Sequence, residues 1–272
     1  MACSVNTLVK SYHTAVVGAG HLGRSLLLRY KRHDPQLRCM AVVRNAATKL
    51  KVRDVITTEF GTPFRANQII LCVKPSQAEH VCKVISKSLR PNTVVISAMA
   101  AITQQQLETW LDTTNVIRIM PSILDNGPIS VYNPHDVCLT LPTTNIIHAE
   151  TELELDAATA VSGCLPGFLA VTFREMIHAA RSVPGSNERM INYLVLRNIR
   201  AFAEADIWDI SGLENLRSTV ATKGGATERG IEKLEDKDAL KHLFRSMFQA
   251  ADGRIAALQG RDISTKHRKH DE

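Results

Sequence analysis

A glycine turn at residues 18–23 sets the first limit on how this chain can fold, because it follows directly on an apolar run. It reads Gly18-Ala19-Gly20-His21-Leu22-Gly23, and its glycines have the spacing of the dinucleotide-binding fingerprint. A strand leading into such a turn at a helix start brings backbone N–H groups and the positive end of the helix dipole to one point, which suits a pyrophosphate. An ordinary strand–turn–helix corner is the alternative interpretation.

Length and composition narrow the class of protein. A chain of 272 residues favours two domains, and 44% hydrophobic with 22% charged residues is typical of a soluble globular protein. No apolar run approaches the ~20 residues that span a bilayer, and residues 1–13 hold no apolar block of signal-peptide length. We therefore expect a cytoplasmic protein that binds no membrane, with a mitochondrial location left open.

The charge and the cysteines argue against two further classes. The net charge is +6, but the basic residues are spread along the chain and aromatic content is 5%, so we expect no nucleic-acid partner. No histidine pair has the spacing of a metal site on an apolar helix, so no bound metal is expected. The six cysteines form no C-x-x-C pair and are typical of reduced, buried thiols: Cys3, Cys39, Cys72, Cys82, Cys138 and Cys164.

Short apolar strands alternate with helical patterns through the first half of the chain, which is typical of a doubly wound α/β domain. The apolar strand expected at residues 69–73 ends in Lys74-Pro75, where a strand meets a ligand crevice at its carboxyl edge. Small residues around Ala98 would let the backbone approach a ligand closely, and Thr103 is a candidate helix cap. Strands are expected at residues 37–43, 69–73, 93–97, 115–120 and 137–141, and helices at 21–30, 76–89 and 103–111.

Arg44 favours one form of the cofactor. A residue at the end of the second strand distinguishes the two nicotinamide dinucleotides: an acid bonds the adenosine ribose of NAD, whereas an arginine accommodates the extra phosphate of NADP. Here the chain reads Val43-Arg44-Asn45, and the nearby Asp34 precedes the strand. The pattern favours NADP(H) over NAD(H). A solvated loop arginine is the alternative.

The second half of the chain reads as all-helical, because apolar residues recur at helical spacing from residue 155 onward. Such a domain usually buries part of its apolar surface against a second copy, so at least a dimer is expected. The fold class is therefore α/β. We expect an N-terminal Rossmann-type dinucleotide-binding domain at residues 1–154, an all-helical dimerisation domain at 155–260 and a disordered tail at 261–272.

Six separated motifs are shared, in order, with one protein family. They are Gly18-Ala19-Gly20-His21-Leu22, Cys72-Val73-Lys74-Pro75, Ser97-Ala98-Met99-Ala100-Ala101, Arg118-Ile119-Met120-Pro121, Ser162-Gly163-Cys164-Leu165-Pro166-Gly167-Phe168 and Thr222-Lys223-Gly224-Gly225-Ala226-Thr227. With them the chain resembles the pyrroline-5-carboxylate reductases over nearly its whole length. The resemblance implies an NADPH- or NADH-dependent enzyme that reduces the cyclic imine 1-pyrroline-5-carboxylate to proline. It also implies a homodimer, built through the helical domain, that can assemble further.

The resemblance also implies the residues of the site. The catalytic residue would be Thr227, which would donate a proton to the substrate nitrogen or orient it. Substrate binding would fall to Thr222, Gly224, Gly225 and Ala226. Cofactor binding would fall to Gly18, Gly20, His21, Leu22, Arg44, Asn45, Val73, Lys74, Pro75, Ala98, Met120 and Pro121.

The turn before Thr227 has a chemistry of its own. It opens a helix, whose free amide groups and dipole can hold a substrate carboxylate. Hydride transfer is the cofactor's chemistry, so the protein needs to position the C=N carbon and supply one proton. A plain helix-capping turn is the alternative.

Four departures from the family pattern cluster at the expected substrate pocket. Ser122-Ile123 stand where the family has Asn-Thr, Leu165 replaces a small residue, Phe168 lacks a tyrosine hydroxyl and Lys223 replaces a proline. Residues 60–68 are also short for the helix expected there. These changes indicate an altered substrate or lost activity.

Three functions follow from this pattern. The first is the proline-forming reductase. The second is a related NADP(H)-dependent oxidoreductase that acts on another small imine or oxo acid. The third is a non-catalytic paralogue that binds NADP(H). A β-hydroxyacid dehydrogenase is disfavoured, because no G-x-x-G-x-G-x-x-x-K-like run is present.

Overall fold

The computed structural model describes residues 11–45, 52, 55–62, 65–205, 207 and 209–261. These fall into two compact units. The sheet unit comprises the described residues up to Pro166 together with those from Ala251 onward, and the helical unit comprises residues 167–250. The border expected at residue 154 falls inside a helix of the sheet unit, and the domain limits stay a prediction. The tail beyond residue 261 lies outside the described residues.

The sheet unit is built on one eight-stranded sheet in the order β3-β2-β1-β4-β5-β6-β7-β8. Neighbouring strands are parallel, except that β6 and β7 run antiparallel. The chain order reverses at β1, and such a switch point is where open α/β sheets bind ligands. The strands are β1 (Ser11–Val17), β2 (Cys39–Val43), β3 (Val55–Glu59), β4 (Arg65–Leu71), β5 (Val94–Ser97), β6 (Val116–Pro121), β7 (Ile129–Tyr132) and β8 (Ile146–His148).

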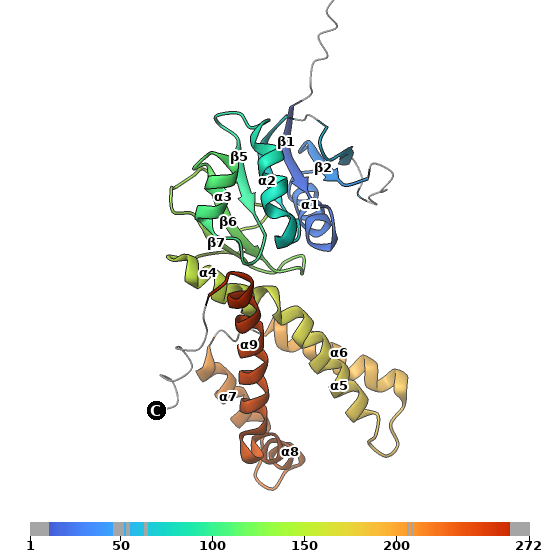
Figure 1. Ribbon diagram of the computed structural model, residues 1–272. Helices are drawn as coiled ribbons and strands as arrows, with labels where there is room; N and C mark the ends of the chain where they lie inside the picture. Colours follow the sequence, from blue (N-terminus) through green and yellow to red (C-terminus); the bar gives the residue numbers. More distant parts are fainter. Residues whose placement is uncertain are drawn as a thin grey trace, which may run out of the picture. The chain divides into compact units, whose positions relative to one another are not determined.

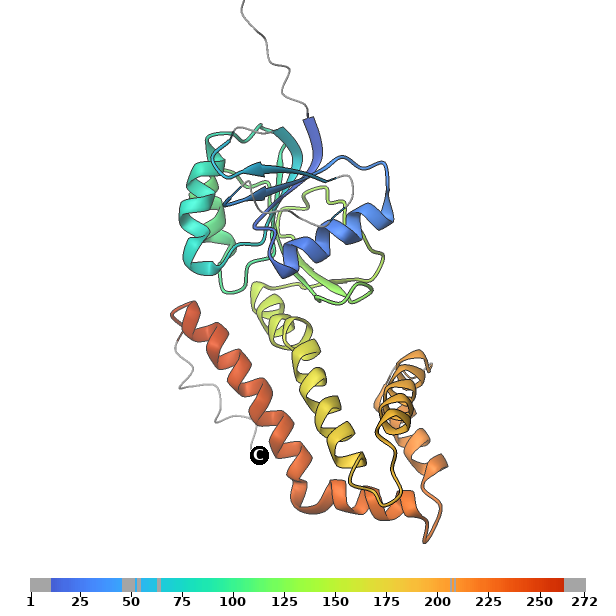
Figure 2. The same cartoon turned by 90° about the vertical axis from the view of Figure 1, so that its right-hand side faces the viewer.

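Helices cover both faces of the sheet, as Figures 1 and 2 show. Helix α1 (His21–His33) packs on one face, and α2 (Ala78–Ser86) and α3 (Gln104–Leu111) pack on the other. Strand β2 is buried along its whole length, because a parallel strand covered on both faces needs a continuous apolar run. Helix α4 (Glu152–Ala158) and the π-helical turn η2 (Thr159–Gly163) complete the unit.

The predicted start of α3 is confirmed. The Thr103 side chain accepts from the Gln106 N–H at 3.2 Å, and the Thr103 N–H donates to the Gln106 side chain at 2.9 Å. This reciprocal capping box satisfies two backbone donors that a helix start leaves free. The helix expected at residues 76–89 is shorter, because Pro75–Gln77 form a 3₁₀ turn before α2 begins.

Two sequence predictions for the sheet were wrong. No strand forms at residues 137–141; instead the Asn133 side chain accepts from the Val137 N–H and donates to the Val137 carbonyl, each at 3.0 Å. This side chain takes the backbone groups that a ladder would use. Strand β3 was missed because only Val55 and Ile56 in it are apolar, and at the sheet edge none of its residues is buried.

The sheet unit also holds the described cysteines, which are all free thiols. Cys39 and Cys82 are buried, and desolvation raises the pKa of the Cys39 thiol to about 11 and that of the Cys82 thiol to about 12. Burial likewise raises the pKa of Cys72 to about 12. These three thiols stay protonated at neutral pH. Cys138 differs, since it is exposed.

The helical unit consists of packed helices with open apolar faces. Among the described residues from 167 to 250, none is buried. Large apolar side chains stand exposed on several helices, including Val171, Tyr193, Leu196 and Leu213. The helices are α5 (Leu165–Ala180), α6 (Glu188–Glu204), α7 (Ile210–Val220), α8 (Ala226–Glu235) and α9 (Ala239–Leu258), whose last turns belong to the sheet unit.

One helical stretch, Glu152–Ala180, is long and apolar enough to cross a membrane when judged by length and composition alone. The sequence had indicated no such run. Core helices of soluble proteins pass the same test, and 22% of this stretch's most apolar window is buried. The observation is therefore weak evidence for a membrane span.

Candidate functional site

The three glycines of the turn each serve a separate geometric purpose. Gly18 has φ +90°, and a Cβ there would lie 2.8 Å from both the Cys72 carbonyl oxygen and a Val73 methyl. A Cβ on Gly23 would strike the Gly18 carbonyl, so this glycine lets α1 pack closely on the turn. At Gly20, no described atom lies within 4 Å of such a Cβ. The turn is thus closed behind and open where a pyrophosphate would approach.

Helix α1 begins at this opening with no side-chain cap. Gly20 is its N-cap residue, and no side chain accepts from the first turn. His21 and Leu22 start the helix, so their N–H groups have no partner four residues back. No acidic residue lies in that first turn to oppose an anion. The residues therefore fit the diphosphate of a dinucleotide.

A cavity of about 460 Å³ continues from the glycine turn along the carboxyl ends of β1 and β2, which is the size range of small-ligand sites. Two predicted cofactor residues, Arg44 and Val73, line it together with Gly18. Its walls are otherwise formed by Val17, Val42, Val43, Phe60, Ser76, Gln77, His80 and Val81. Arg44 is exposed to solvent beside this space, as a ligand for a ribose phosphate would be.

The remaining predicted cofactor residues lie at the same edge of the sheet. Lys74 and Pro75 follow β4, with Lys74 exposed at the start of the 3₁₀ turn. Ala98 follows β5, and its N–H donates to the Leu71 carbonyl at 2.9 Å. Asn45 follows Arg44 at the end of β2 and is exposed. The parallel topology brings these strand ends together at one edge of the sheet.

Met120 and Pro121 end strand β6 and are buried. The π-helical turn η2 packs against them, since a Cβ on Gly163 would lie 3.3 Å from the Met120 sulfur. The Ser162 hydroxyl oxygen is buried here without a hydrogen-bond partner among the described residues. Leu165, the first residue of α5, lies two residues beyond this turn.

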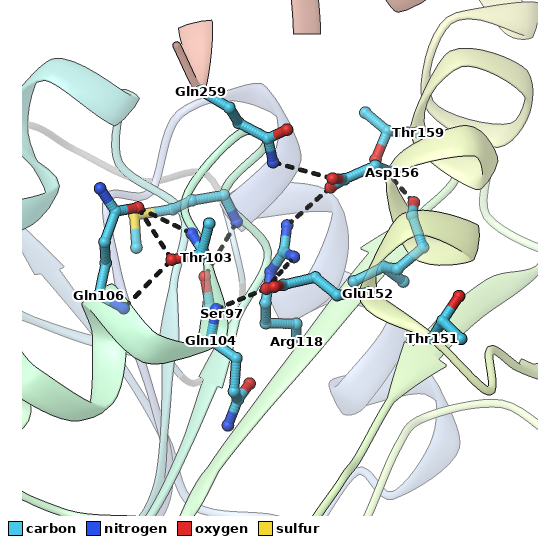
Figure 3. A network of polar contacts seen from close by, with 12 residues as sticks. Ser97, Thr103, Gln104, Gln106, Arg118, Thr151, Glu152, Asp156, Thr159 and Gln259 are labelled. Atoms are coloured by element: carbon cyan, nitrogen blue, oxygen red, sulfur yellow. Dashed lines mark hydrogen bonds and ion pairs between the residues drawn. The ribbon is translucent and has the colours of Figure 1, made fainter. Parts of the chain in front are cut away.

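A buried ionic cluster fixes this region, and sequence reasoning missed it. Arg118 on β6 is 1% exposed and is paired with Glu152 at 2.6 Å and with Asp156 at 3.1 Å, both on α4 (Figure 3). The Gln259 amide, just after α9, donates to the second Asp156 oxygen at 2.9 Å. The Gln104 N–H donates to Glu152 at 2.5 Å. The cluster joins β6, α3, α4 and the end of α9 beside Met120.

The sequence carries two signals for this cluster, namely the spacing of its acids and an arginine inside an apolar strand. Glu152 and Asp156 are four residues apart, so they lie on one face of a helix. Arg118 stands in an apolar strand, and a charge in a buried strand needs partners. Only the folded structure shows that Arg118 is the partner of these two carboxylates.

The loop after Pro121 is held against α1 by side chains of that helix. The Ser25 hydroxyl donates to the Ile123 carbonyl at 3.1 Å, and Arg29 donates to the Gly127 carbonyl at 2.9 Å. Arg29 is almost fully buried, and desolvation lowers its pKa from the usual range. Ser122 is buried, whereas Ile123 is 41% exposed. The departure from the family pattern thus puts one apolar side chain at the loop surface.

The predicted substrate turn lies in the helical unit at the start of α8. Gly224 has φ +75°, and a Cβ on Gly225 would lie 2.5 Å from the Thr222 hydroxyl oxygen, so this turn needs both glycines. Gly225 is the N-cap of α8 and supplies no side chain to its first turn. Ala226 and Thr227 begin the helix, and Thr227 is exposed. The Gly225 N–H donates to the Thr222 carbonyl at 2.8 Å, so the N–H groups of Ala226 and Thr227 at the helix start are the ones without a partner four residues back.

Glu228 changes the electrostatics of this turn. Its carboxylate accepts from the Gly224 N–H at 2.6 Å, so one amide expected to hold a substrate carboxylate already has an internal partner. Lys223 next to it is exposed and can offset that charge. Phe168, the other departure in this unit, packs edge-on against Phe248 with ring centroids 5.8 Å apart.

Two family models match the chain. One described as pyrroline-5-carboxylate reductase dimerisation matches residues 152–258, and one described as NADP oxidoreductase, coenzyme F420-dependent, matches residues 13–101. The pyrroline-5-carboxylate reductase of Pseudomonas aeruginosa is 25% identical over 263 residues, which cover 90% of this chain and 96% of the relative. That of Vibrio alginolyticus is 24% identical over 265 residues, covering 90% and 97%.

Solved structures share the fold. The pyrroline carboxylate reductase of Plasmodium falciparum, solved with NADP bound, has a TM-score of 0.78 at 19% identity and covers 91% of this chain and 98% of its own. A pyrroline-5-carboxylate reductase of Coxiella burnetii has a TM-score of 0.75 at 21% identity and covers 92% and 99%. The matched models and the named relatives indicate a nicotinamide-dependent oxidoreductase. Over 90% of its length the chain is similar to the pyrroline-5-carboxylate reductases, and its residues 152–258 match their dimerisation model.

Proposed function

We propose that this chain reduces 1-pyrroline-5-carboxylate to proline with a nicotinamide cofactor. The observation that carries the proposal is the full-length similarity to the Pseudomonas aeruginosa reductase, which spans both units of the chain. The geometry adds a diphosphate cradle open at Gly20 and a second helix start at Ala226. The cradle fits the diphosphate of the cofactor, and the second helix start fits the carboxylate of the substrate.

The sheet unit binds the cofactor and positions its nicotinamide end. The N–H groups at the start of α1 hold the cofactor diphosphate, and the carboxyl ends of β4, β5 and β6 border the nicotinamide end. The bound dihydronicotinamide supplies a hydride. Arg118 ties β6 to α4 through Glu152 and Asp156. This holds Met120 and η2 in place beside the nicotinamide end of the cofactor site.

The substrate turn supplies the remaining groups. Reduction adds a hydride to the C=N carbon and a proton to the nitrogen, so the cyclic imine becomes a secondary amine. The Thr227 hydroxyl holds the nitrogen and passes or orients that proton. The N–H groups of Ala226 and Thr227 at the start of α8 hold the carboxylate, and Thr222 shapes the turn by accepting from the Gly225 N–H at 2.8 Å.

NADP(H) is the preferred cofactor in this proposal. Arg44 lines the cavity at the end of β2, where the ribose of the adenosine half lies in this fold. The described lining of that cavity contains no aspartate or glutamate to bond a free ribose hydroxyl. A guanidinium paired with a phosphate gains a charge-assisted hydrogen bond.

The assembly in this proposal is a homodimer formed through the helical unit. The absence of buried residues among its described positions, together with exposed apolar side chains on α5, α6 and α7, supports a partner of the same shape. The same surface accounts for the apolar character of Glu152–Ala180 without a membrane. We place the enzyme in the cytoplasm, with no nucleic-acid or membrane partner.

The test is a rate measurement on the purified chain. With NADPH and racemic 1-pyrroline-5-carboxylate, absorbance at the reduced-nicotinamide band should fall and proline should form in equal amounts. A Thr227→Val variant should keep NADPH affinity and lose most of kcat. NADPH binding with turnover only of another imine or oxo acid would move the chain to that second function, and binding without any turnover would make it a non-catalytic paralogue.

A further inference from the structure

Phe60 and His80 form an aromatic pair inside the cavity that also contains Arg44. Their ring centroids are 6.0 Å apart and the planes are tilted by 55°. Both side chains line the cavity. Phe60 follows β3, whereas His80 lies in the first turn of α2 after β4, so the pair connects elements that leave the sheet three strands apart.

The backbone fixes one member of this pair. The Phe60 N–H donates to the Val43 carbonyl at 2.8 Å, which holds Phe60 beside the end of β2 and next to Arg44. Phe60 is also partly buried against the core of the sheet, together with Val73. His80 is exposed, so a ligand in the cavity can still cover its ring. Phe60 is thus held by the sheet on one side of the cavity, and His80 stands exposed on the other.

Apart from Arg44 and the ring pair, the described lining of the cavity is apolar or neutral. Val42, Val43, Val73 and Val81 supply aliphatic surface, and Ser76 with Gln77 supplies neutral polar groups. A purine has two apolar faces and a polar edge, which match such a slot. Arg44 is the permanent cation of the lining and therefore takes the phosphate, while the ring pair takes the base.

We propose that His80 and Phe60 bind the adenine of the cofactor in this enzyme. This pair acts independently of Arg44, which binds the ribose phosphate. The proposal rests on the cofactor binding stated above. Arg44 distinguishes phosphorylated from unphosphorylated ribose, whereas His80 contributes equally to both because it contacts the base. The cavity therefore binds the ribose phosphate through Arg44 and the adenine through the ring pair, and the two contributions are independent.

The test uses two fragments that contain only this half: adenosine 2′,5′-bisphosphate and 5′-AMP. Their dissociation constants are measured by calorimetry for the full chain and for His80→Ala, His80→Phe and Arg44→Gln. His33→Ala is the matched control, because His33 is an exposed histidine of the same unit outside the cavity. Base–aromatic stacking is worth about 1–3 kcal/mol, so His80→Ala should weaken both fragments by about fivefold or more.

The other variants complete the pattern. His80→Phe should restore most of the affinity, Arg44→Gln should weaken only the bisphosphate, and His33→Ala should change neither. Unchanged binding in His80→Ala, or a loss confined to the bisphosphate, would overturn the assignment of His80 to adenine. Absence of fragment binding by the unmodified chain would overturn it as well. The proposed reduction fails on a different result, namely no NADPH-dependent proline formation.

Discussion

The two compact units differ in how much apolar surface each one buries by itself. The sheet unit encloses two clusters, one on each face of the sheet, and residues such as Leu26, Ile70 and Leu107 are fully buried. The helical unit buries no described residue, although large apolar side chains such as Tyr193, Leu196 and Leu213 stand exposed on its helices. One unit is complete as a single chain, and the other is completed by association.

This difference matters for function because the predicted site is divided in the same way. The diphosphate turn belongs to the complete unit, and Thr227 belongs to the incomplete one. Cofactor binding should therefore depend on the folding of a single chain. Catalysis should depend on assembly as well.

The largest effect is expected from a charge placed on the helical unit. Leu196 on α6 and Ile56 on β3 are 52% and 51% exposed, so they are matched in a single chain. Leu196→Glu occurs twice in a symmetric dimer and would remove two carboxylates from water, which should weaken the dimer by about a thousandfold or more. Sedimentation velocity measures the assembly.

Ile56→Glu is the control for this experiment and should leave the dimer intact. NADPH should still bind to Leu196→Glu while proline formation is lost. Equal behaviour of the two variants would mean that the helical unit does not form the dimer face.

The next largest effect concerns the ionic cluster of the sheet unit. Arg118→Met removes the guanidinium that pairs with both Glu152 and the buried Asp156, while Asp156 keeps the Gln259 amide at 2.9 Å and Arg261 at 3.4 Å. The loss should cost about 3 kcal/mol of unfolding free energy. Arg32→Met is the matched control, since Arg32 pairs with Asp125 at 2.7 Å with both side chains about half exposed, and should cost about 1 kcal/mol or less. Urea denaturation compares the two. Similar losses would show that the cluster does not hold α4 to β6.

Gly20 and Gly23 of the turn should separate the effect on stability from the effect on cofactor binding. Gly23→Ala puts a methyl group against the Gly18 carbonyl and should destabilise the sheet unit by about 1–3 kcal/mol. Gly20→Ala meets open space in the described structure and should leave stability nearly unchanged, but should weaken NADPH binding by about tenfold by crowding the diphosphate. Thermal unfolding and NADPH titration check both. Strong NADPH binding by Gly20→Ala would remove this turn from the cofactor site.

The smallest effect is expected at the substrate turn. Glu228→Gln keeps a hydrogen-bond acceptor for the Gly224 N–H and removes a negative charge beside the expected substrate carboxylate. Two unit charges about 4 Å apart in water repel by about 1 kcal/mol, so KM for the imine should fall about fivefold with kcat little changed. Steady-state kinetics measure it, with the exposed Glu232→Gln on the same helix as control. A rise in KM would assign Glu228 to substrate binding instead.

The sequence predicts the sheet unit far better than the substrate site, and the reason is physical. Continuous apolar runs such as β2, and a Thr103 cap followed by Gln106, carry their structural cause within a few residues. Strand β3 and the irregular segment around Val137 do not, because pairing at a sheet edge and the side chain of Asn133 decide them.

The site shows the same limit. The glycine turn is visible in the sequence because its three glycines stand within six residues, and two of them, Gly18 and Gly23, are required by close backbone contacts. The pairing of Arg118 with Asp156 and the contact of Phe60 with His80 join residues from distant elements. The hydrogen bond from Gly224 to Glu228 is local, but nothing in the pattern distinguishes an acid that caps the turn from one that faces solvent.

The most direct test of the central proposal follows the hydrogen itself. The purified chain is incubated with 1-pyrroline-5-carboxylate and NADPH that carries deuterium at both positions of the nicotinamide C4, and the product is analysed by mass spectrometry. We predict proline with one deuterium, bound to the carbon that belonged to the C=N bond. Proline without deuterium, or no proline while NADPH remains bound, would contradict the assignment of this chain as a reductase of that imine.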